Sequence, residues 1–105
     1  MIVIFTHAAE RDLEAIGDFI SMSDPRRAAS FVDALIDRCN LIADHPFAFS
    51  LVPRFESNGV RRRYYAKYLI FYRIRFERVE ILRIISFRPR LRQAAFVSYA
   101  ERHQA

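Results

Sequence analysis

The chain has 105 residues, of which 52% are hydrophobic and 14% aromatic, and it contains only 2 Gly and 1 Cys. These numbers predict one globular domain spanning residues 1–105, and they argue against an internal disulfide, a multi-cysteine metal site and Gly-rich phosphate loops. The net charge of +5 divides into −4 over residues 1–53 and +9 over residues 54–105, and 16 of the 17 basic residues are Arg, which predicts an acidic partner, protein or nucleic acid.

The first apolar segment, Ile2–Phe5, is a strand candidate. It is too short to be a secretion signal and lacks the basic start of one. No longer apolar run in the sequence could span a bilayer. We therefore expect a cytoplasmic protein with no membrane partner.

A first helix is predicted over residues 7–22. Thr6 can cap its N-terminus, and Leu13, Ile16 and Ile20 recur at helical spacing as an apolar stripe. The polar residues between them should face solvent, namely Arg11, Asp12, Glu14 and Asp18.

A second helix should follow after a very short connection. Asp24 suits its N-cap and Pro25 its first helical residue, while Pro46 should end it near residues 44–45. Its apolar stripe consists of Ala28, Phe31, Val32, Leu35, Cys39 and Ile42. Because Cys39 lies on this stripe, we interpret it as a small buried hydrophobic residue and not as a nucleophile.

The segment from Pro46 to Gly59 reads as a loop pinned by aromatic residues, which either seals the edge of the core or has a function. A strand over Val60–Tyr65 comes next. Strand alternation places Arg61 and Arg63 on one face and Arg62 on the other, beside or at the margin of the apolar face.

Tyr68–Phe87 has the composition of two antiparallel strands, with no Gly or Pro to interrupt it. A turn at residues 77–78 would place Tyr72 opposite Arg83 and leave one face almost wholly apolar, to be covered by the helices. A last helix is expected from Leu91, Ala94, Ala95, Val97 and Tyr99. The predicted fold is α+β, in the order β-α-α-β-β-β-α, with an antiparallel sheet packed against a helical hairpin.

Few residues suggest catalytic or metal chemistry. The three His lie far apart without helical pairing, and no nucleophile or metalloprotease motif is present, so neither a metal nor a cofactor is expected. The hairpin arginines Arg73 and Arg83 are more informative. An arginine in the centre of an apolar strand carries a desolvation cost unless it has a partner or lines a groove.

Five segments together resemble the ParE branch of the RelE/ParE toxin superfamily over residues 3–87. They are Ala9–Ile16, Asp24–Ala28, His45-Pro46, Tyr68–Ile74 and Val79–Ile84. The resemblance implies a toxin of a type II toxin–antitoxin system, as in plasmid stabilisation, with the first strand lying beside the last. It also implies a ParD-like antitoxin as partner.

Helix-in-groove recognition and strand addition would bury the excess apolar surface of the helices. We expect the antitoxin groove to be formed by Leu13, Ile16, Ile20, Phe31 and Leu35. ParE-type members poison DNA gyrase by binding, without acting as enzymes. Contacts to that target are expected from Arg73, Arg83, Arg88, Arg90 and Phe96.

Two alternatives remain open. RelE-type members cut messenger RNA on the ribosome, using a strand arginine and a tyrosine that follows a later arginine. Here Leu69 stands at the first position, and Phe96 stands at the second, after Arg90. The sequence also has Ser86–Arg90 in place of the His-Gly-x-Arg ending usual in ParE. A non-toxic binding module of the same fold is the second alternative.

Overall fold

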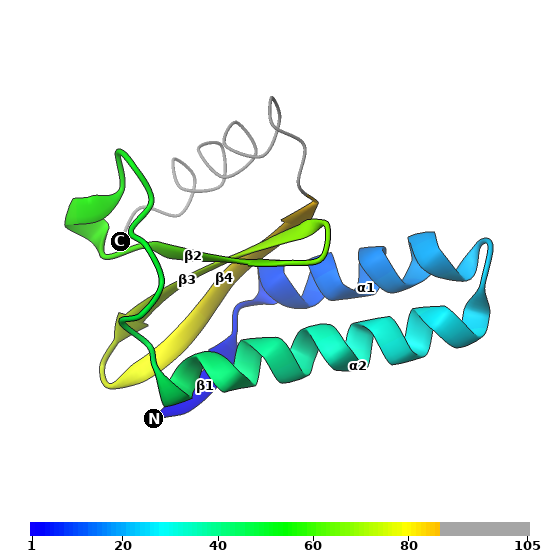
Figure 1. Cartoon of the computed structure of the whole chain (residues 1–105), viewed down its shortest axis with the longest axis horizontal. Helices are drawn as coiled ribbons and strands as arrows, with labels where there is room; N and C mark the ends of the chain where they lie inside the picture. The colour runs from blue at the N-terminus through cyan, green and yellow to red at the C-terminus, as the bar shows by residue number, and fades with distance from the viewer. Residues whose placement is uncertain (87–105) are drawn as a thin grey trace.

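The structure, a computed structural model, describes residues 1–86. The expected last helix and the candidate residues Arg88, Arg90 and Phe96 lie outside the described residues. The elements are, in order, β1 (Ile2–Phe5), α1 (His7–Ser21), α2 (Pro25–Leu41), 3-10 turns at Ile42–Asp44 and Glu56–Asn58, β2 (Arg61–Tyr65), β3 (Tyr68–Arg75) and β4 (Arg78–Ser86) (Figure 1). The predicted α+β order is confirmed over this part of the chain. Neither α1 nor α2 combines the length and the apolar character that a bilayer-spanning helix needs.

Both helices begin where the sequence predicts. The Thr6 hydroxyl accepts a hydrogen bond from the Ala9 N–H at 3.1 Å, and the Asp24 carboxylate accepts one from the Arg27 N–H at 3.1 Å. Each bond satisfies an N–H that has no partner inside its helix. The 3-10 turn after α2 continues the helical path to Asp44, just before Pro46.

The sheet has four strands in the order β1-β4-β3-β2. β1 pairs in parallel with β4, so the first strand lies beside the last, and the other pairs are antiparallel. The sheet is therefore mixed. Figure 1 shows α1 and α2 running antiparallel on one side of it, with their connecting turn reaching beyond the strands.

The register of the β3–β4 hairpin differs from the prediction. The turn consists of Phe76 and Glu77, both with positive φ (54° and 58°), as in the type I′ turns that match strand twist. Tyr72 consequently pairs with Ile81, and a shift in register just beyond it pairs Phe71 with Arg83. The sequence concealed this turn because neither residue is the Gly, Asn or Asp that such a turn favours.

A β-bulge reverses the alternation of side chains between the two faces of β4. The register shifts by one residue between Phe71 and Tyr72. Ile81 and Ile84 both pack in the core between the sheet and the helices, whereas Leu82 and Ile85 belong to a second cluster. An extra residue in one strand has this effect because side chains alternate with a period of two.

The hairpin buries apolar side chains on both faces. The cluster on the helix side includes Leu35, Cys39 and Tyr72, all fully buried. The second cluster combines Leu69, Phe71 and Leu82 of the hairpin with Val52, inside the loop after α2, and Val60, which follows that loop.

Aromatic residues pin this loop, as predicted. The Tyr72 hydroxyl donates a hydrogen bond of 2.6 Å to the Pro46 carbonyl, and the Phe49 ring meets the Tyr72 ring edge-on, with centroids 6.4 Å apart. Phe55 packs against the second cluster, while Phe47 stays 65% exposed. The loop therefore serves mainly to cover the sheet.

The conformation of the β3–β4 turn allows a prediction about stability. Replacing Phe76 and Glu77 with Asn-Gly should raise the free energy of unfolding by about 1 kcal/mol, because L residues other than Asn and Asp resist the left-handed region. Urea unfolding should show a higher midpoint with an unchanged slope. The control is Lys67→Gly, in the β2–β3 turn at a position without positive φ, which should lower the stability. Equal effects of the two changes would contradict the turn assignment.

Candidate partner-binding site

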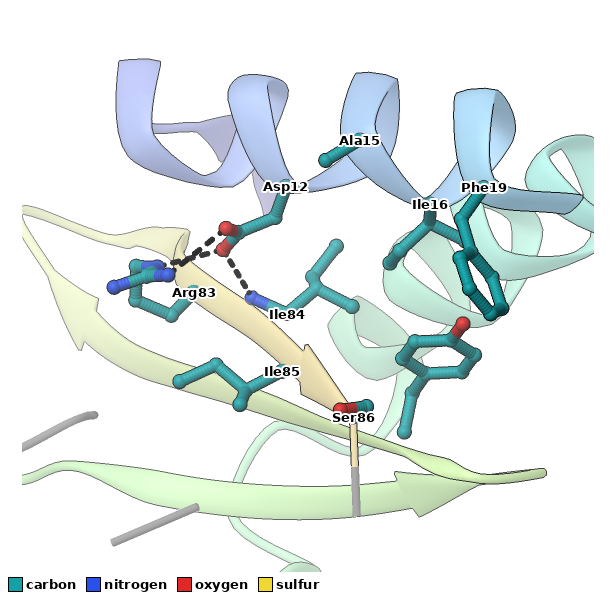
Figure 2. Close-up of a pocket in the computed structure, with 9 residues that line it drawn as sticks. Asp12, Ala15, Ile16, Phe19, Arg83, Ile84, Ile85 and Ser86 are labelled. Carbon is teal, nitrogen blue, oxygen red and sulfur yellow. Dashed lines mark hydrogen bonds and ion pairs between the residues drawn. The ribbon is translucent and has the colours of Figure 1, made fainter. Parts of the chain in front are cut away.

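An ion pair joins α1 to β4. The Arg83 Nε lies 2.6 Å from Asp12 Oδ2 and its Nη2 lies 2.9 Å from Asp12 Oδ1, while the backbone N–H of Ile84 donates to the same Oδ2 at 2.8 Å (Figure 2). The two side chains are only 20% and 14% exposed. The expectation that Asp12 faces solvent is therefore wrong. The clue in the sequence was Arg83, whose central strand position required a partner.

The pair lies where α1 replaces β1 as the neighbour of β4. β1 pairs with β4 only over the β4 residues Arg78 to Ile81. Beyond it, the Thr6 hydroxyl donates to the Leu82 carbonyl at 2.9 Å, and Asp12 accepts from Ile84. Within residues 1–86, no strand pairs with this side of β4 after Ile81. Side chains of α1 thus satisfy part of an open strand edge.

Next to this junction is an open cavity of about 300 Å³. It is lined by Asp12, Ala15, Ile16 and Phe19 of α1, by Tyr68 of β3 and by Arg83, Ile84, Ile85 and Ser86 of β4. Figure 2 shows the α1 residues along one side and the end of β4 along the other. The cavity is mostly apolar, with the ion pair as a polar group among its lining residues.

Exposure varies strongly along this cavity. Ile16 is buried, whereas Phe19, one turn further along α1, is 69% exposed. Burial raises the pKa of the Tyr68 hydroxyl above its usual value of 10.0. Phe19 thus extends the apolar lining of the cavity to the protein surface.

Only one of the five residues expected to form an antitoxin groove lines the cavity. Ile16 lines the cavity, and Leu35 is fully buried in the core. Leu13, Ile20 and Phe31 are partly buried and pack against the core. Ala15 and Phe19, which we did not select from the sequence, provide the exposed part of this surface.

The two described arginines expected to contact a target are both ion-paired. Arg73 Nε lies 2.7 Å from Glu80 Oε1, its register partner on β4. Arg83 pairs with Asp12. The desolvation cost of placing arginines in this hairpin is thus offset by carboxylates of the same chain.

Cys39 lies apart from this cavity and is fully buried, as predicted. Burial raises the pKa of its thiol from 9.0 to about 12, although the Arg63 guanidinium acts in the opposite direction. The thiol is therefore a packing residue and a poor nucleophile.

The dependence of stability on alkaline pH should test the raised pKa of the Cys39 thiol. Above pH 9.0 the unfolded thiol ionises while the folded thiol stays protonated, so the free energy of unfolding should fall by about 1.4 kcal/mol per pH unit towards pH 12. Urea unfolding between about pH 8 and 9.5 measures the onset of this fall, because tyrosines, with a usual pKa near 10, ionise mainly above that range. Cys39→Ala should flatten the slope, and an unchanged slope in that variant would contradict the assignment.

The described residues form a small α+β domain, with a helical hairpin on one face of a four-stranded mixed sheet and a cavity between α1 and the last strand. Residues 3–89 match the family model described as the ParE toxin of the type II toxin–antitoxin system parDE. The chain therefore belongs to the ParE toxin family.

Solved structures agree with this assignment. The chromosomal ParDE toxin–antitoxin system from P. aeruginosa contains a chain similar to this one, with a TM-score of 0.70, 23% identity, and coverage of 84% of this chain and 97% of that one. A chain of the RelBE2 toxin–antitoxin complex from Mycobacterium tuberculosis gives a TM-score of 0.60 and 26% identity, covering 81% and 95%. A search of curated proteins gave no match.

Proposed function

We propose that this ParE-family toxin is neutralised by a cognate ParD-like antitoxin that inserts a segment between α1 and the end of β4. The cavity there has an apolar lining and an exposed Phe19 at its edge. The adjacent edge of β4 could accept an added strand, the recognition mode that combines backbone hydrogen bonds with side-chain pockets. The similarity to solved toxin–antitoxin complexes supports the same proposal.

The second part of the proposal concerns the target, which we infer to be DNA gyrase in the cytoplasm, poisoned by binding. The observation that favours binding over RNA cleavage is the pairing of Arg73 with Glu80 and of Arg83 with Asp12. A ribonuclease would use such arginines to stabilise developing phosphate charge. Neutralised by carboxylates, they offer much less charge for that role.

Purified full-length toxin should therefore abolish supercoiling by gyrase and cause cleaved DNA to accumulate. The matched control is the toxin saturated with its antitoxin, which should leave gyrase fully active. Messenger RNA in a reconstituted translation reaction should stay intact at the same toxin concentration. Unaffected gyrase together with cleaved message would reject the gyrase proposal in favour of the RelE-like activity, and failure of both assays would favour a non-toxic binding module.

A further inference from the structure

Four arginines of α2 and β2 each lie over an aromatic ring. The guanidinium carbons are 4.8–5.7 Å from the ring centroids, in the pairs Arg27 with Phe31, Arg38 with Tyr65, Arg63 with Phe49, and Arg61 with Phe47. These residues come from α2, from β2 and from the loop between them. None of them lines the cavity between α1 and β4.

The four pairs are joined to one another. The Phe31 and Tyr65 rings are stacked with centroids 6.0 Å apart. Arg63 Nη1 donates to the Arg38 carbonyl at 3.3 Å, and Arg61 Nη1 donates to the Phe49 carbonyl at 2.7 Å. These eight residues are thus linked through side-chain and backbone contacts, and we call them the arginine–aromatic strip.

The positive charge of the strip is not neutralised within the described part of the fold. There, the two ion pairs to a carboxylate are those of Arg73 and Arg83, and neither belongs to the strip. The acidic residues Asp33 and Asp37 lie on α2 too, but helical geometry places them roughly a quarter to a third of a turn from the line through Arg27 and Arg38. Four guanidinium groups therefore share one surface.

Each ring also holds its arginine in place. A guanidinium over a ring loses less conformational freedom on binding, and its N–H groups suit the paired oxygens of a phosphate. Arg61 and Arg63 each use one terminal nitrogen on carbonyl groups, which leaves their other N–H groups for a ligand. Arg27 and Arg38 are exposed.

We propose that the arginine–aromatic strip binds a single strand of nucleic acid, with its arginines on successive phosphates. The one-to-one alternation of arginine and ring favours nucleic acid over an acidic peptide, because bases stack on guanidinium planes and rings whereas carboxylates do not. Phe47, which is 65% exposed, offers a ring for such stacking. The proposal is independent of the gyrase target and of the antitoxin cavity.

Fluorescence anisotropy with a labelled oligothymidylate of about 12 nucleotides tests this strip in the full-length chain. Arg27→Ala/Arg38→Ala should weaken binding at least tenfold. The matched control, Arg11→Ala/Arg78→Ala, removes the same charge from exposed positions outside the strip and should change affinity by no more than about threefold. Thermal unfolding of each variant establishes that the fold is retained.

Salt dependence adds a second readout. Four phosphate contacts predict a slope of log K against log salt near −3, and the strip variant should lose about 1.4 of that slope. Phe47→Ala should weaken binding with little change in the salt slope, because it removes an exposed ring and leaves the charge of Arg61 in place. Equal losses in the two double variants would overturn the proposal. So would tighter binding of duplex DNA, or equal competition by polyglutamate, which would indicate an acidic protein partner.

Discussion

Replacing Asp12 with Ala should lower the free energy of unfolding by about 3 kcal/mol, which corresponds to a fall in melting temperature of about 12 °C or more. The change removes both hydrogen bonds to Arg83 and the acceptor of the Ile84 N–H. A guanidinium that is 20% exposed would then have lost its carboxylate. Urea unfolding at neutral pH measures the effect.

Glu14→Ala provides the matched control, because Glu14 is an exposed carboxylate on the same helix. Its effect should stay within about 0.5 kcal/mol. The double variant Asp12→Leu/Arg83→Met should recover much of the lost stability, because removing both charges is less costly than removing only the carboxylate of a largely buried ion pair. Similar effects of Asp12→Ala and Glu14→Ala would show that the junction contributes little to stability.

The largest expected effect on function comes from Phe19→Asp. If the antitoxin covers the cavity beside β4, this change should weaken the toxin–antitoxin complex at least a hundredfold, because an exposed aromatic side chain that the antitoxin would bury is replaced by a charge. Isothermal titration with the cognate antitoxin measures the dissociation constant. Gyrase inhibition by the free toxin should be unchanged.

Met22→Asp is the control for this experiment. Met22 is 84% exposed and follows the same helix, but it does not line the cavity. Its dissociation constant should stay within about threefold of the wild-type value. A tight complex with Phe19→Asp would place the antitoxin elsewhere on the toxin, and a loss in both variants would show that the measurement reports only added charge.

The α1–β4 junction and the arginine–aromatic strip differ in chemistry, and we therefore propose different partners for them. At the α1–β4 junction, Asp12 neutralises Arg83 beside an apolar cavity, as suits a protein segment. Along α2 and β2, arginines such as Arg38 and Arg63 pair with rings and carbonyls and keep their charge, as suits a polyanion.

The helices were predictable because their signals are local. Thr6 and Asp24 cap them through bonds to residues three positions away, and the apolar spacing of each helix identifies its buried face. The alternation of Arg61, Arg62 and Arg63 in β2 followed in the same way from the period of a strand. The burial of Cys39 needed no more than its place on a helical stripe.

The hairpin register needed the tertiary structure. Phe76 and Glu77 adopt positive φ without being the residues that signal it, and the bulge near Tyr72 leaves no mark in the composition of either strand. Since each depends on how the whole sheet twists against the helices, a pattern within the strands could not reveal it.

By itself, the sequence determined the order of the elements from β1 to β4, the buried faces of the helices and the resemblance to the ParE family. Only the tertiary structure decided the partner of Arg83, because Asp12 is 71 residues away in the chain and has the same local pattern as its solvent-facing neighbours. The cavity beside β4 arose for the same reason, since β1 ends early and α1 takes its place. Local spacing specifies which face of an element is buried, whereas contacts between distant elements decide which polar groups meet there.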